Sequence, residues 1–155
     1  MFFNNGVSPP AASNDAAFIP KSLERQEVQL LLQEFIASRY APDRRFLDLS
    51  NVAAVQPVMR AVDRLTSPAW AAILKAASTR APEAETVSFN ENQFRTLYPV
   101  SAHSTFLPNV VNLSFAGNKV ENLTSLDALN GLTRLRELVF FNNPVADQNK
   151  PNYRR

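Results

Sequence analysis

Apolar and polar positions recur in the same order twice within the second half of the chain. An aliphatic residue is followed by apolar residues three and five positions later, by asparagine at eight and by an apolar residue at ten. The same order returns 25 residues further on. The alternation at the third and fifth positions predicts a short strand with one buried face. The two copies are Val110, Leu113, Phe115, Asn118, Val120 and Leu135, Leu138, Phe140, Asn143, Val145.

This order is the leucine-rich-repeat pattern, whose usual period is about 20–29 residues. A buried asparagine can bond backbone groups where the chain leaves the strand. Val87, Phe89, Asn92 and Phe94 form an earlier copy. Residues 46–52 form a first, imperfect copy in which Val52 replaces the asparagine. The pattern therefore predicts an α/β solenoid of four parallel strands with helices on its convex side, connected by right-handed crossovers.

Helical spacing of apolar residues predicts the remaining elements. Residues 21–40 carry an apolar stripe and end at Ala41-Pro42-Asp43, which suits a helix capping the first repeat. Residues 55–80 predict two short helices separated at Pro68, with Thr66 or Ser67 as the cap of the second and Trp70 in the core. Leucines every third residue in 123–132 favour a 3₁₀ helix.

These patterns divide the chain into four segments. We expect a flexible linker or tail over 1–20, an N-terminal capping helix over 21–45, about four repeats over 46–147 and a truncated C-terminal segment over 148–155. Phe2, Phe3, Phe18 and Ile19 could dock onto the domain or a partner, or be incidental in a flexible tail. The last repeat has no repeat beyond it, so we expect either a piece of a longer protein or a partner that covers this end.

Composition restricts the classes of function. The 155 residues suit one domain, and a formal net charge of +2 leaves a local basic patch as the only route to nucleic acid. The chain has no cysteine, which excludes thiol chemistry and disulfides. The sequence has no long apolar run and no signal-peptide pattern, so we expect neither a membrane span nor secretion.

Candidate catalytic chemistry is sparse. His103 is the single histidine, in a connection between two prolines, and we expect it at the surface. Phosphate-binding and dinucleotide-binding glycine motifs are missing, and Glu83, Glu85 and Glu91 lack a partner set for acid–base work. The sequence therefore predicts a non-enzymatic protein with no catalytic residues, no metal site and no cofactor.

Binding is the better class, and two surfaces are candidates. The outward strand positions form a concave face that is polar at first and apolar at the last strand. The residues proposed there for protein binding are Asn112, Ser114, Glu137, Val139 and Phe141. Val139 and Phe141 could form a docking patch or contact a missing cap.

Arginines near the first helix and in the first crossover are the second candidate. They could form one patch that binds RNA phosphates without reading sequence, if the crossover packs beside the helix. Scattered solubilising arginines are the alternative. The candidate RNA-binding residues are Arg39, Arg44, Arg45, Arg60 and Arg64.

The segment EFIASRYAPDRRFLDLSNV (34–52), its long helical insertion and the repeats of 110–145 together resemble one known family. They are similar to the leucine-rich-repeat domain of the fungal nuclear mRNA export receptors, over roughly residues 28–153. Val52 departs from the consensus asparagine, and the closing cap is missing.

The resemblance implies a role in mRNA export, with shuttling between nucleus and cytoplasm through nuclear pores. In such receptors this domain contributes RNA and adaptor-protein contacts. Other domains, not seen here, pair with an NTF2-like partner and bind FG nucleoporins. The leading hypothesis is a binding module of an mRNA export receptor, and the alternative is a protein–protein interaction scaffold that binds no RNA.

Overall fold

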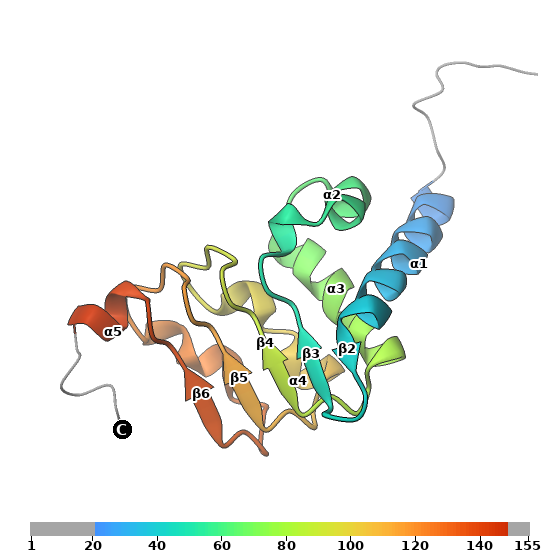
Figure 1. Ribbon diagram of the computed structural model, residues 1–155. Helices are drawn as coiled ribbons and strands as arrows, with labels where there is room; N and C mark the ends of the chain where they lie inside the picture. The colour runs from blue at the N-terminus through green and yellow to red at the C-terminus, as the bar shows by residue number, and fades with distance from the viewer. Residues whose placement is uncertain (1–20, 149–155) are drawn as a thin grey trace, which may run out of the picture.

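The computed structural model describes residues 21–148 of the chain. The predictions of a linker over 1–20 and of a C-terminal segment over 148–155 lie outside the described residues, apart from Gln148. The described residues form a sheet with helices packed against it (Figure 1). The α/β class is confirmed.

The sheet has five strands rather than the predicted four, in the order β2-β3-β4-β5-β6. The last four pair in parallel, whereas β2 is antiparallel to β3. The additional strand forms because a tight turn, in which the Arg44 N–H donates to the Ala41 carbonyl (3.2 Å), folds the chain back after the first helix. The strands are β2 (Tyr40–Ala41), β3 (Phe46–Asp48), β4 (Thr86–Ser88), β5 (Asn112–Ser114) and β6 (Glu137–Val139).

The crossovers are built from short helices, and the long first crossover holds two of them as predicted. The Thr66 hydroxyl accepts a hydrogen bond from the Ala69 N–H (3.3 Å), so Thr66 caps the second helix of that crossover. The α-helices are α1 (Lys21–Arg39), α2 (Gln56–Val62), α3 (Ser67–Arg80), α4 (His103–Phe106) and α5 (Pro144–Gln148). The 3₁₀ helices are η2 (Val52–Ala54), η3 (Tyr98–Val100) and η4 (Thr124–Leu129), the last in the leucine-rich segment as predicted.

Helix α1 lies at the β2 end of the sheet and packs against α3 and α2 (Figure 1). Leu32, Phe35 and Ile36 are buried along one side. Leu30 is 62% exposed and Leu31 38% exposed, so the outer side of this helix is less polar than a terminal cap requires. The capping role of α1 remains a prediction.

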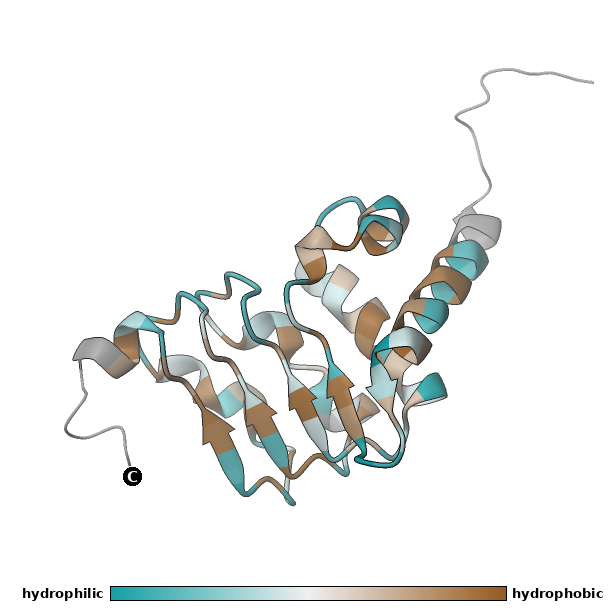
Figure 2. Ribbon diagram, in the orientation of Figure 1, coloured by the Kyte–Doolittle hydropathy of each residue, from teal (hydrophilic) through white to brown (hydrophobic). Residues whose placement is uncertain are grey.

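The core follows the repeat pattern. Phe89, Phe115 and Phe140 occupy the same position in successive repeats, and their rings stack at 5.2 and 5.8 Å between centroids. Trp70 is buried against Phe89, as predicted from its place in the helical pattern. Figure 2 shows β6 hydrophilic at its start and hydrophobic at its end, in agreement with its sequence Glu137–Val139.

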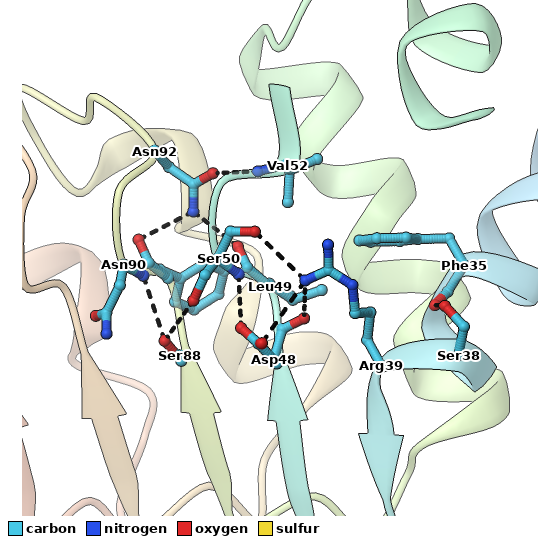
Figure 3. Close-up of polar contacts among 11 residues, drawn as sticks. Phe35, Ser38, Arg39, Asp48, Leu49, Ser50, Val52, Ser88, Asn90 and Asn92 are labelled. Carbon is cyan, nitrogen blue, oxygen red and sulfur yellow. Dashed lines mark hydrogen bonds and ion pairs between the residues drawn. The ribbon is translucent and has the colours of Figure 1, made fainter. Parts of the chain in front are cut away.

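The repeat asparagines bridge neighbouring repeats. Asn118 Nδ2 donates to the carbonyls of Phe115 (2.8 Å) and Phe89 (3.0 Å), and its Oδ1 accepts from the Asn92 N–H (2.9 Å). Asn92 makes the equivalent contacts to the repeat before it, donating to Leu49 and accepting from the N–H of Val52 (Figure 3). The predicted use of a side-chain amide for backbone groups is therefore confirmed.

His103 contradicts the expectation of a surface residue. Its side chain is 0% exposed and its ring meets Phe89 edge-on at 4.7 Å. The connection after β4 turns inward at η3 and α4, which brings the imidazole under the sheet. Neither ring nitrogen has a hydrogen-bond partner within the described residues, and burial lowers the pKa of His103 to about 3.

Candidate nucleic-acid interface

The sheet face opposite the core is polar and internally hydrogen-bonded. Ser50 and Ser88 share a hydrogen bond between their hydroxyls (2.8 Å), and the Ser114 hydroxyl lies 2.6 Å from Asn90 Oδ1, to which it donates. Asn112 Nδ2 donates to the Thr86 hydroxyl (2.9 Å). These lateral bonds fix the side chains of β3, β4 and β5 in one layer, part of which is drawn in Figure 3.

The five predicted protein-binding residues come together at the β6 end of this face. Asn112 pairs in register with Glu137, and Ser114 with Val139. Phe141 lies two residues after the end of β6 and is 51% exposed. Asn112 and Ser114 are partly buried and already bonded to β4, so Glu137 and Phe141 are the accessible members of the group.

Arg39 occupies the start of the same face but is held by the fold. Its Nη1 donates to the carbonyls of Asp48 (3.3 Å) and Ser50 (3.4 Å), and its guanidinium lies over the Phe35 ring (Figure 3). It also approaches the Asp48 carboxylate at 3.7 Å. These contacts give Arg39 a structural role in joining α1 to β3.

Arg44 and Arg45 lie in the turn between β2 and β3, at the amino ends of the parallel strands. Arg44 is exposed beside the Phe46 ring. Arg45 donates to Glu85 Oε2 at 2.8 Å, and this hydrogen bond raises the pKa of Arg45. Both guanidinium groups are therefore positioned by neighbours while remaining accessible.

Arg60 and Arg64 do not join this group. Arg60 belongs to α2, and Arg64 follows two residues after that helix ends. Figure 1 places α2 beyond the carboxyl ends of the strands, opposite the turn that carries Arg44 and Arg45. Helix α2 packs beside α1, as the prediction of a single patch required, but it lies at the opposite edge of the sheet from the turn that carries Arg44 and Arg45.

Two arginines that the sequence interpretation missed stand at the same edge as Arg45. Arg134 and Arg136 lie in the three residues before β6, and Arg134 shares a cavity of about 250 Å³ with Arg45. The signal was present in the repeat alignment, because Arg136 occupies the same position before its strand as Arg45 does before β3. Closeness along the chain groups Arg134 with Arg136 but does not place them beside Arg45.

The four residues that precede the parallel strands form a row across this edge, which we call the amino-edge row. Its members are Arg45, Glu85, Val111 and Arg136. The carbonyl of each of the first three accepts two backbone N–H groups from the next strand; Arg45, for example, accepts from Glu85 (2.9 Å) and Thr86 (3.1 Å). The backbone of the row is therefore fixed by the sheet itself.

Two cavities lie along the row. The larger, of about 520 Å³, is lined by Glu85, Val111, Thr133, Arg134, Leu135 and Arg136. The smaller, with Arg45, Glu83 and Asn109, shares Glu85 and Arg134 with it. Together they present three guanidinium groups, two carboxylates and an apolar floor at one edge.

Other kinds of site find no support in the described chain. Between residues 21 and 148, acidic and histidine side chains do not gather in any group of three that could hold a metal ion. Among the same residues, every helix is too short or too polar to span a membrane.

Comparison with known proteins identifies relatives of this arrangement. No protein-family model matches the chain. The chain is 29% identical over 150 residues to mRNA export factor mex67 of Schizosaccharomyces pombe and 27% identical over 126 residues to MEX67 of Candida albicans. These matches cover 92% and 77% of the chain but only 25% and 20% of the relatives' own lengths.

Solved structures agree with the sequence relatives. The Mex67 leucine-rich-repeat domain of Chaetomium thermophilum matches with a TM-score of 0.64 and 23% identity, over 76% of this chain and 78% of that one. A structure of Chaetomium Mex67:Mtr2 subunits matches with a TM-score of 0.65 and 25% identity, over 76% of each chain. The chain is thus similar in sequence and fold to the leucine-rich-repeat domain of the fungal mRNA export receptors, and the predicted resemblance is confirmed.

Proposed function

We propose that the chain is a non-enzymatic binding module of an mRNA export receptor, contributing RNA and adaptor-protein contacts. The observation that carries the proposal is the similarity to two Mex67 proteins across most of the chain. Both relatives are named mRNA export factors, and neither name describes an enzyme. The longer relatives contain this region as about a quarter or less of their length, so the role is that of one part of a receptor.

The RNA contact is proposed at the amino-terminal edge of the sheet. Arg44 is exposed, and Arg45 and Arg134 line a common cavity. Arg136 makes no side-chain hydrogen bond or ion pair with the described residues, so its charge is free for a ligand. Guanidinium groups bind phosphate oxygens through paired N–H donors, and such contacts attach RNA without selecting sequence.

The adaptor contact is proposed at the β6 end of the polar face. Phe141 is half exposed beside Val139, and Glu137 gives the same strand an exposed carboxylate. An aromatic anchor next to a charged rim is the arrangement that protein interfaces favour. An adaptor segment with an apolar side chain and a nearby basic residue fits this surface.

The relatives support a proposal for the assembly in which this region works. A Chaetomium relative was solved as Mex67:Mtr2 subunits, and we propose that a receptor containing this region likewise works with a second, NTF2-like subunit. Binding to FG nucleoporins would belong to other regions of such a receptor. The location implied is the nucleus, with passage to the cytoplasm through nuclear pores.

Equilibrium binding of a fluorescent single-stranded RNA at two salt concentrations tests the RNA role. With about three phosphates neutralised, affinity is expected to fall about 20-fold between 50 and 200 mM salt. The double variant Arg44→Glu, Arg45→Glu is expected to lose nearly all binding at low salt.

Arg95→Glu is the matched control, because Arg95 is exposed and follows β4, at the carboxyl ends of the strands. This control is expected to bind nearly as well as the unchanged chain. Absence of RNA binding at low salt would leave the protein–protein scaffold as the better account.

A further inference from the structure

The larger cavity at the amino-edge row is lined by basic, acidic and apolar residues, and phosphate binding alone requires only the basic ones. Glu85 precedes β4 and Arg136 precedes β6, so the two lie on either side of Val111 in the row. Arg134 also lines the cavity, and its Nη1 donates to Asn109 Oδ1 at 3.2 Å. Val111 and Leu135 provide apolar surface in the same cavity. A site for bare phosphate gains nothing from a carboxylate or an apolar floor.

Glu85 is held in place and keeps one acceptor free. Its Oε2 accepts from Arg45 at 2.8 Å, which fixes the carboxylate and offsets its charge. Within the described residues Oε1 has no hydrogen-bond partner, and the side chain is 38% exposed. The backbone of Glu85 is fixed as well, because its carbonyl accepts the N–H groups of both Val111 (2.7 Å) and Asn112 (3.0 Å).

The spacing suits one nucleotide. The backbones of Glu85 and Arg136 are two strands apart in the row, or about 10 Å at the usual strand separation. The volume of about 520 Å³ lies in the range of small-ligand sites, about 300–1,000 Å³. A nucleotide also has the matching polarity, with an anionic phosphate, a flat apolar face and a hydrogen-bonding edge.

We propose that this cavity holds one unpaired nucleotide of the bound RNA and prefers a base with an exocyclic amino group. Arg134 and Arg136 contact its phosphate, and Val111 and Leu135 face the base. The amino group donates to Glu85 Oε1, as carboxylates accept from the N4 amino group of cytosine in nucleic-acid complexes. Uracil presents an acceptor oxygen at the same place, which the carboxylate repels.

This inference rests on the proposed RNA role. It adds a base preference to phosphate contacts that do not distinguish one RNA sequence from another. Oligocytidylate and oligouridylate of equal length isolate the preference, because they share charge, sugar and ring size and differ at the position facing Glu85. We expect the unchanged chain to bind oligocytidylate about 5-fold or more tightly, the lower end of one good base contact.

Two variants separate the base contact from the phosphate contacts. Glu85→Gln is expected to reduce the preference to near unity, since glutamine can both donate and accept. Arg134→Gln with Arg136→Gln is expected to weaken both oligonucleotides alike and to lower the salt slope by about 1.4. Arg95→Gln is the control for loss of an exposed arginine, and unfolding midpoints check that each variant is folded.

Equal affinity of the unchanged chain for the two oligonucleotides overturns the inference and leaves the proposed RNA role intact. A preference that survives Glu85→Gln also overturns it, because another residue must then read the base. Failure to bind either oligonucleotide at low salt overturns the RNA role itself and this inference with it.

Discussion

Asn92 Oδ1 accepts a hydrogen bond of 2.9 Å from the backbone N–H of Val52, the residue that stands at the asparagine position of the first repeat. Each repeat asparagine therefore makes hydrogen bonds with backbone groups of the repeat before it. The first repeat follows β2, which is antiparallel and two residues long, and so has no earlier repeat to bridge. Its departure from the consensus has a structural reason.

Asn118→Ala is expected to destabilise the chain by about 1–3 kcal/mol, because it leaves buried backbone carbonyls and N–H groups of two repeats unpaired. Asn118 is 4% exposed and contacts the backbone on both sides. Chemical denaturation measures the change. Asn130→Ala, at an exposed asparagine, serves as the control and should shift the midpoint little.

Val52→Asn is expected to lower stability by about 1–3 kcal/mol although it restores the consensus residue. Val52 is fully buried, and a new amide there would have no preceding repeat to bond. The reciprocal change Asn92→Val is also expected to destabilise, since it removes the bonds to Leu49 and Val52. A higher unfolding midpoint for Val52→Asn would contradict this account of the asparagine hydrogen bonds between repeats.

Much of the fold could be predicted because repeat positions carry both strand and turn information. Phe89 and Phe115 alternate with polar neighbours, and Asn118 marks the turn. Strand β2 could not be predicted, because a strand of two residues has no alternation to read. His103 was misplaced because a polar residue between prolines usually lies in an exposed loop, whereas here the loop turns under the sheet.

The candidate RNA-binding site stays a prediction, but the structure shows which of its arginines lie together. Arg44 and Arg45 are neighbours along the chain, and the structure keeps them at one edge. Arg136 is adjacent to them only through the parallel register of β3 to β6, which aligns residues tens of positions apart. Arg60 carries the same charge, yet its helix, α2, lies past the carboxyl ends of the strands.

His103 is expected to make folding sensitive to mild acid. The folded chain holds the pKa of His103 at about 3, whereas an unfolded histidine has a pKa of about 6.5. Below pH 6.5 the unfolded chain takes up a proton that the folded chain does not, so this contribution to stability is full above pH 6.5 and is lost as pH falls toward 3. The slope is at most about 1.4 kcal/mol per pH unit, or about 2 kcal/mol between pH 6.5 and 5.

Denaturation of the unchanged chain and of His103→Leu at pH 7, 6 and 5 measures this effect. The variant is expected to lose less stability across the series, because leucine carries no proton and leaves no buried ring nitrogen unpaired. Parallel profiles for the two proteins would show that the imidazole does not resist protonation in the folded chain.

Substitutions at Arg39 and Arg44 are expected to distinguish a structural role from an RNA-binding role. Arg39→Gln removes contacts to the carbonyls of Asp48 and Ser50 and to the Phe35 ring, and should cost about 1 kcal/mol of stability. The Arg44 side chain is exposed, and its recorded contact within the described residues is with the Phe46 ring, so Arg44→Gln should leave the unfolding midpoint nearly unchanged. RNA binding should respond in the opposite order, with Arg44→Gln lowering affinity and reducing the salt slope by about 0.7 and Arg39→Gln changing neither much. A larger loss of RNA affinity in folded Arg39→Gln than in Arg44→Gln would place the RNA on the polar face beside Arg39 instead of at the amino ends of the strands.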